Sequence, residues 1–203
     1  RKKINVFIFL SKTILKFSKL KENRNKTKSK LLLLLENHLK YNLKELNLNK
    51  DEYFFFINKK DIKKYNFQNF LKKNLLKKYQ IIPINGNYPS EFEILLTEKE
   101  IKKNEAIFIY EISHNLTIEF DGLNKLLNKE NNQNLAYLFL LKSTKHSEYF
   151  ANIKNKFIKK ITKKTDEAEL SILNNYYFNN AEFFFTQFKK NNKNVDQVNL
   201  INI

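Results

Sequence analysis

The sequence predicts an α+β fold, a ferredoxin-like sandwich in which two helices cover one face of a four-stranded antiparallel sheet with a long β-hairpin. Two apolar runs with an alternating pattern, residues 92–96 and 116–120, are joined by a highly charged segment. The predicted elements follow the order strand, helix, strand, strand, helix, strand. We assign this core to residues 53–143, between a basic N-terminal extension (1–52) and a basic, aromatic C-terminal extension (144–203), both mainly helical.

The first predicted strand is followed directly by the first predicted helix. Residues 52–58 (EYFFFIN) are rich in aromatic residues, a composition typical of strands. Asp61 can cap a helix over residues 61–79. Apolar side chains on one face of a 3.6-residue period are those of Phe67, Phe70, Leu71 and Leu75. We therefore expect this helix to pack on the sheet, with its lysines on the other sides.

The hairpin is expected to form the second and third strands. Residues 80–84 (QIIPI) contain a proline, which excludes a helix and favours an extended lead-in. The alternation in 92–96 and 116–120 has the two-residue period of a strand. Residues 97–105 (TEKEIKKNE) between them are too charged to be buried, so they are expected to form an exposed tip.

Two further elements complete the predicted core. Residues 123–130 (LNKLLNKE) follow an Asp-Gly pair and are expected to form a short helix. Residues 135–142 (LAYLFLLK) are predicted to form the last, buried strand.

Both extensions are predicted to be mainly helical. Residues 1–30 combine eleven basic residues and one acid with apolar residues at helical spacing, as expected for a targeting peptide or for an arm that lies on nucleic acid. Residues 31–50 are expected to form a second amphipathic helix. Residues 152–164 are strongly basic and 174–188 strongly aromatic, and both are expected to be helical.

Composition indicates a polyanionic partner. The formal net charge is +17, from 38 Lys and Arg against 21 Asp and Glu. Only Arg1 and Arg24 are arginine, and Lys, Asn, Phe, Ile and Tyr are abundant, which is typical of an AT-rich genome. Cysteine is absent, which excludes disulfides and cysteine-based zinc sites. No apolar run approaches the roughly 18–20 residues that span a bilayer.

The sequence shows no pattern typical of an enzyme. His38, His114 and His146 have no metal-ligand spacing, and two glycines cannot form a glycine-rich phosphate loop. The acids at 98, 100 and 105 lie among lysines, so a solvated charge cluster is expected there. We therefore expect no catalytic residue, metal or cofactor.

The hairpin segment resembles ribosomal protein S-ten of the small subunit. Residues 110–114 (Tyr-Glu-Ile-Ser-His) resemble that family's Tyr-Glu-Ile-x-Thr-His strand, 80–83 its proline-containing lead-in and 92–96 its second strand. The resemblance covers about 53–143. It implies a structural constituent of the small subunit of a mitochondrial ribosome, located in the matrix, that contributes to translation. Its implied partners are ribosomal RNA in the subunit head and neighbouring ribosomal proteins, with no small-molecule substrate.

The predicted RNA-binding residues are basic residues of the hairpin tip, the first helix and the two extensions, with the histidine of the motif. They are Lys99, Lys102, Lys103, His114, Lys63, Lys64, Lys12, Lys16, Lys154, Lys156, Lys159 and Lys160. Lysine contacts to phosphate supply affinity without reading sequence.

A second hypothesis belongs to another class of protein. An accessory subunit of a mitochondrial inner-membrane complex would place its basic N-terminal helix and the aromatic residues 176–188 at the lipid interface.

Overall fold

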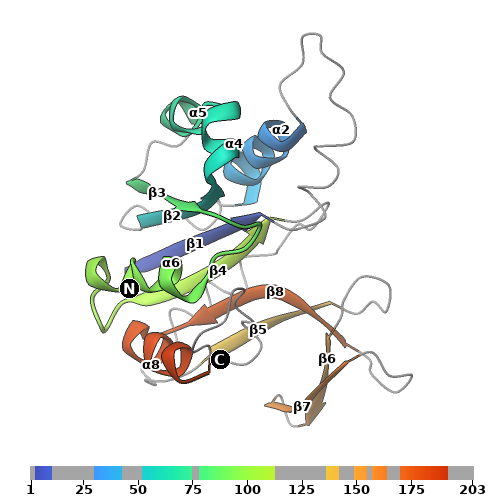
Figure 1. The fold of residues 1–203 in the computed structure, drawn as a ribbon. Coiled ribbons are helices and arrows are strands. Elements are labelled where there is room, and N and C mark those ends of the chain that lie inside the picture. Colours follow the sequence, from blue (N-terminus) through green and yellow to red (C-terminus); the bar gives the residue numbers. More distant parts are fainter. Residues whose placement is uncertain are drawn as a thin grey trace.

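A computed structural model shows one mixed sheet with helices on both of its faces (Figure 1). It describes residues 3–10, 30–42, 52–74, 78–112, 136–141, 149–154, 157–163 and 170–191. The strand order is β3-β2-β1-β4-β8-β6-β7, and β5 also pairs with β8.

Four parallel strands form one half of the sheet: β1 (Ile4–Leu10), β2 (Glu52–Asn58), β3 (Tyr79–Ile84) and β4 (Ala106–Ile112). β1 lies between β2 and β4, so that Phe7 is opposite both Phe54 and Ile109. Parallel strands covered on both faces require nearly continuous apolar sequence. The runs INVFIFL and AIFIYEI meet that requirement, and every residue in them is buried.

Antiparallel strands form the other half. β8 (Leu170–Phe178) pairs with β4 and also with β5 (Ala136–Leu141). β6 (Tyr149–Lys154) and β7 (Phe157–Lys163) form a hairpin that joins the sheet through β8.

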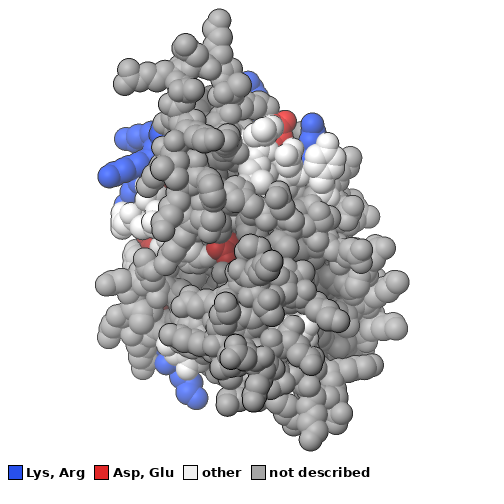
Figure 2. Space-filling view, turned by 90° about the vertical axis from the view of Figure 1, so that its right-hand side faces the viewer, with Lys and Arg blue, Asp and Glu red and all other residues white. Residues whose placement is uncertain are grey.

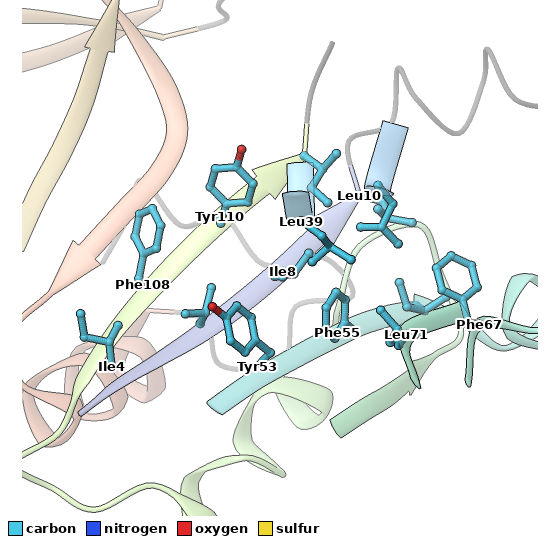
Figure 3. Close-up of a cluster of buried hydrophobic side chains, with 14 of the residues drawn as sticks. Ile4, Ile8, Leu10, Leu39, Tyr53, Phe55, Phe67, Leu71, Phe108 and Tyr110 are labelled. Atoms are coloured by element: carbon cyan, nitrogen blue, oxygen red, sulfur yellow. The ribbon is translucent and has the colours of Figure 1, made fainter. Parts of the chain in front are cut away.

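One face of the parallel half is covered by α2 (Lys30–Asn37), the π-helix η1 (His38–Asn42), α4 (Lys59–Lys64) and α5 (Phe67–Asn74). Buried side chains of α2, η1 and α5, with the half-buried Ile62 of α4, pack on strand residues such as Phe55 in one apolar cluster (Figure 3).

The other face is covered by α6 (Glu91–Leu95), the short 3₁₀ helix η2 (Glu98–Glu100) and α8 (Ala181–Asn191). Phe184 of α8 is fully buried and lies 6.1 Å from the ring of Phe7, centroid to centroid.

The predicted ferredoxin-like sandwich is wrong, because the first arm of its hairpin is a helix. Ser90 accepts a hydrogen bond from the backbone N–H of Glu93, whose carboxylate accepts one from the backbone of Ser90. This capping box starts α6 where the alternation of residues 92–96 favoured a strand. Residues 97–105 form η2 and turns beside α8, so they are no hairpin tip.

The helical prediction for the extensions is confirmed for residues 31–42, which lie in α2 and η1, and for 181–188, which lie in α8. It is wrong for the described residues of the extensions that form strands. Residues 4–10 form the central strand β1, and 152–164 contain parts of β6 and β7. Within 174–188, residues 174–178 belong to β8 and residues 181–188 to α8. Strands from all three predicted ranges, 1–52, 53–143 and 144–203, lie in this one sheet.

Other predicted elements are confirmed in place. The strands predicted at 52–58 and 135–142 correspond to β2 and β5, and the extended lead-in at 80–84 lies in the strand β3. Residues 136–140 of β5 are half-buried or exposed, so the expectation that this strand is buried is wrong. The range predicted as one helix, 61–79, contains two helices, α4 and α5, because Asn66 adopts the left-handed conformation (φ 48°) between them. Its last residue, Tyr79, already belongs to β3. Asn58, rather than Asp61, caps the first of these helices.

Several predictions fall outside the described residues. They are the strand at 116–120, the helix at 123–130 and much of the two terminal extensions. None of the helices in the described ranges combines the length and apolar character needed to cross a membrane.

Candidate functional site

The carboxyl ends of the parallel strands contain a topological switch point. From β1 the chain adds β2 and β3 on one side, and β4 then pairs with the other side of β1. Leu10 and Ile112, the last residues of β1 and β4, lie opposite each other at this edge. Open α/β sheets bind ligands outside the carboxyl ends of their strands at such a point.

A buried carboxylate lies at this switch point. Glu111 is the only charged residue of β4 and is 8% exposed. Its backbone N–H donates to Oδ1 of Asn175 on β8 (2.8 Å), and its carboxylate accepts a hydrogen bond from the Tyr88 hydroxyl. The Tyr88 ring lies 6.1 Å from that of Phe9, so Tyr88 extends across the end of β1 toward β4.

The loop that carries Tyr88 is held at both of its ends. Nδ2 of Asn58, at the end of β2, donates to the carbonyls of Asn85 (3.2 Å) and Gly86 (2.9 Å). The buried Glu93 carboxylate accepts from the backbone N–H groups of Asn85 (2.9 Å) and Ser90 (2.7 Å). These contacts fix residues 85–90 beside the carboxyl ends of β2 and β3.

A second polar pair lies near the same edge on the other face of the sheet. Nδ1 of His38 and the Tyr110 hydroxyl are 2.6 Å apart, and both residues are buried. His38 begins the π-helix η1, a rare element that is often found at functional sites.

Basic residues follow β1 and β2 in the sequence. Lys59 and Lys60 come directly after β2 and are exposed. The stretch 11–30 follows β1 in the sequence, contains no glycine and has Glu22 as its only acid. Its basic residues are Lys12, Lys16, Lys19, Lys21, Arg24, Lys26, Lys28 and Lys30.

The opposite, amino-terminal edge carries a separate polar cluster. The Glu52 carboxylate contacts Nζ of Lys78 (2.8 Å) and of Lys3 (3.2 Å) and accepts from Nε2 of Gln80 (3.0 Å). Burial opposes ionisation of this carboxyl, but the hydrogen bonds from Lys78, Gln80 and Lys3 outweigh burial and lower its pKa. The hydrogen bond to Glu52 likewise raises the pKa of Lys78. This cluster joins the starts of three strands, so its role is structural.

The structure does not bring the predicted RNA-binding residues together. Lys63 and Lys64 lie on α4, whereas Lys99, Lys102 and Lys103 lie near α8 on the other face of the sheet. Those in β6 or β7 are Lys154, Lys159 and Lys160, and those outside the described residues are His114, Lys12, Lys16 and Lys156.

The acids of the predicted tip are not one solvated cluster. The carboxylate of Glu98 pairs with Nζ of Lys189 (2.7 Å). Glu105 is 8% exposed and accepts a hydrogen bond from Nδ2 of Asn5 (3.0 Å).

Sequence reasoning missed the residues at the switch point. Glu111 interrupts the apolar run AIFIYEI near its carboxyl end, and this interruption was the available signal. Tyr88 and Asn175 had no comparable signal, because β3, β4 and β8 come together only in the folded sheet.

Comparison with known proteins identifies the fold. No family model matches the chain, and no curated protein does. A Bacillus anthracis protein assigned as a glucose-1-phosphate thymidylyltransferase has a TM-score of 0.62 and 11% identity, over 95% of this chain and 76% of that one. The inositol-1-phosphate CTP transferase of T. maritima has a TM-score of 0.60 and 8% identity, over 87% of this chain and 70% of that one. The mannose-6-phosphate isomerase of Helicobacter pylori has a TM-score of 0.61 and 14% identity, over 93% of this chain and 75% of that one.

These likenesses overturn the ribosomal interpretation. The fold is that of nucleotidyltransferase-like proteins, so the resemblance to ribosomal protein S-ten is wrong. The likeness also contradicts the predicted structural role in translation and the predicted ribosomal RNA and ribosomal protein partners. It contradicts the expected absence of a small-molecule substrate, because these neighbours are named for reactions on small molecules. The expectation of a non-enzyme is contradicted because the structural neighbours are enzymes, and these neighbours give the inner-membrane-complex hypothesis no support. The mitochondrial location stays a prediction.

Proposed function

We propose that this protein is a nucleotidyltransferase-type enzyme that joins a nucleoside monophosphate unit to a phosphorylated small molecule. The observation that carries the proposal is the buried Glu111 carboxylate at the switch point between β1 and β4. The likeness to a thymidylyltransferase and a CTP transferase supplies the reaction class.

In this reaction a phosphate oxygen of the acceptor attacks the α-phosphorus of a nucleoside triphosphate. The bond to the β-phosphate oxygen breaks and pyrophosphate leaves. Catalysis of such transfers depends mainly on positioning and on compensation of the phosphate charge. The exposed Lys59 and Lys60 and the basic stretch 11–30 supply positive charge after β2 and β1. Because that stretch has no glycine, lysine side chains rather than a glycine-rich backbone loop would bind the phosphates.

A magnesium ion commonly bridges triphosphates and one or two carboxylates in enzymes of this kind. Glu111 would be the protein ligand, because its carboxylate is the acid at the switch point and Mg²⁺ prefers oxygen ligands. The described residues include no group of three metal-binding side chains, so water and phosphate oxygens would complete the shell.

The test measures pyrophosphate release from each of the four ribonucleoside triphosphates and dTTP, with Mg²⁺ and a panel of sugar phosphates and inositol phosphate. We expect release with at least one pair of substrates. Glu111→Gln should lower the rate by about 10-fold or more. Glu182→Gln, on the exposed surface of α8, should change the rate less than about twofold. Absence of both triphosphate binding and pyrophosphate release across the panel would overturn the proposal.

A further inference from the structure

We propose that the helical layer formed by α2, η1, α4 and α5 docks on an anionic lipid surface. Lys59 and Lys60 of this layer follow the carboxyl end of β2, near the switch point, but the proposal does not depend on the proposed reaction.

The layer is strongly basic on its outer side. Between residues 59 and 74, Asp61 is the only acid. The lysines there are all exposed: Lys59, Lys60, Lys63, Lys64, Lys72 and Lys73. α5 buries Phe67, Phe70 and Leu71 on its inner side, which directs Lys72 and Lys73 away from the sheet.

The same layer exposes two large apolar side chains. Leu33 is 50% exposed and Tyr41 is 65% exposed, on the side of α2 and η1 that also exposes Lys40. Leu35 and Leu39 of the same segment are buried against the sheet.

These side chains share one outer surface. The buried residues of α2, η1 and α5 belong to the single cluster of Figure 3, so all three elements cover the same face of the sheet. In Figure 2, blue lysine atoms are visible in the upper part of the molecule, at its left edge and at its upper right, where red acidic atoms lie beside them.

A lipid surface matches both features. Lysines attract the anionic headgroups, and apolar and tyrosine side chains enter the interface between headgroups and acyl chains. Nucleic acid would match the lysines through its phosphates but would leave Leu33 without a function.

The test is co-sedimentation of the full chain with phosphatidylcholine vesicles and with vesicles that contain about one-third phosphatidylserine. Replacing Lys63, Lys72 and Lys73 with Ala should weaken binding to the anionic vesicles by about 10-fold or more. The matched control replaces Lys99, Lys102 and Lys190, which are equally exposed but lie outside this layer. Each triple variant lowers the net charge by three, from +17 to +14. The control should bind within about twofold of the wild type.

A second variant tests the apolar contacts at constant charge. Leu33→Ser with Tyr41→Ser should also weaken binding several-fold, because less apolar surface enters the interface. Circular dichroism should show that every variant is folded, since all the replaced side chains are exposed. The proposal would be overturned if binding did not depend on phosphatidylserine or if the two triple variants lost binding equally. It would also be overturned if Leu33→Ser with Tyr41→Ser lost no binding. Tighter, layer-dependent binding to an RNA oligonucleotide would overturn it too, and would identify a nucleic-acid surface instead.

Discussion

The hydroxyl of Tyr88 donates a hydrogen bond to the carboxylate of Glu111 across the carboxyl ends of the parallel strands. This contact links the loop after β3 to the carboxyl end of β4. The Tyr88 ring also lies beside that of Phe9 on β1. A ligand that binds Glu111 directly must therefore displace or share the Tyr88 hydroxyl.

Tyr88→Phe should destabilise the folded protein by about 1–3 kcal/mol, because the buried Glu111 carboxylate loses a donor. Urea unfolding followed by circular dichroism measures the change, with a lower midpoint and an unchanged slope. Tyr41→Phe is the control, since Tyr41 is 65% exposed. That variant should stay within about 0.5 kcal/mol of the wild type. Equal stability of the two variants would contradict the importance of the contact.

Glu93→Ala should destabilise the protein by about 2 kcal/mol, because the carboxylate both caps α6 and holds Asn85. The measurement is again urea unfolding. Glu182→Ala, which removes an exposed pair with Lys103, should lower stability far less than Glu93→Ala, because solvent screens that pair. Similar losses in the two variants would mean that Glu93 contributes no more than a surface charge.

The stability that Glu52 contributes should depend on pH in the acid range. Burial opposes ionisation of this carboxyl, but the hydrogen bonds from Lys78, Gln80 and Lys3 outweigh burial and lower its pKa on folding. The ionised form therefore stabilises the folded state. The contribution is present above the ordinary pKa of 4.5 and is lost as pH falls through the lower pKa of the folded state. Unfolding free energies of wild type and Glu52→Gln, measured between neutral pH and the acid range, should converge as pH falls. A difference that stays constant would show that the charge on Glu52 is not responsible.

Phe184→Ala should destabilise the protein by about 3–5 kcal/mol, because the ring is fully buried between α8 and the sheet. Phe92→Ala offers a matched control, since that ring is 70% exposed on α6. Thermal and urea unfolding should show a large shift for Phe184 and a change within about 0.5 kcal/mol for Phe92. The reverse order would mean that α8 does not pack as described.

Part of this fold could be predicted from local sequence. β2 and β3 have the aromatic and extended character of strands, and α5 shows its apolar face at Phe67, Phe70 and Leu71. The run 4–10 was equally readable as a buried strand, but the basic residues around it favoured a helix.

The strand order could not be predicted in the same way. β1 pairs with β4 about one hundred residues later, and nothing local to either run identifies its partner. The switch point depends on that pairing, so Tyr88, Glu111 and Asn175 become a site only once three distant segments share one edge.

The pairing of β4 with β8 also has a consequence during synthesis. Until residues 170–178 leave the ribosome, β4 has β1 on one side and lacks β8 on the other. The unpaired edge then presents the apolar run AIFIYEI, and exposed edges of this kind aggregate. Nascent or truncated chains that end before residue 170 are therefore expected to need a chaperone.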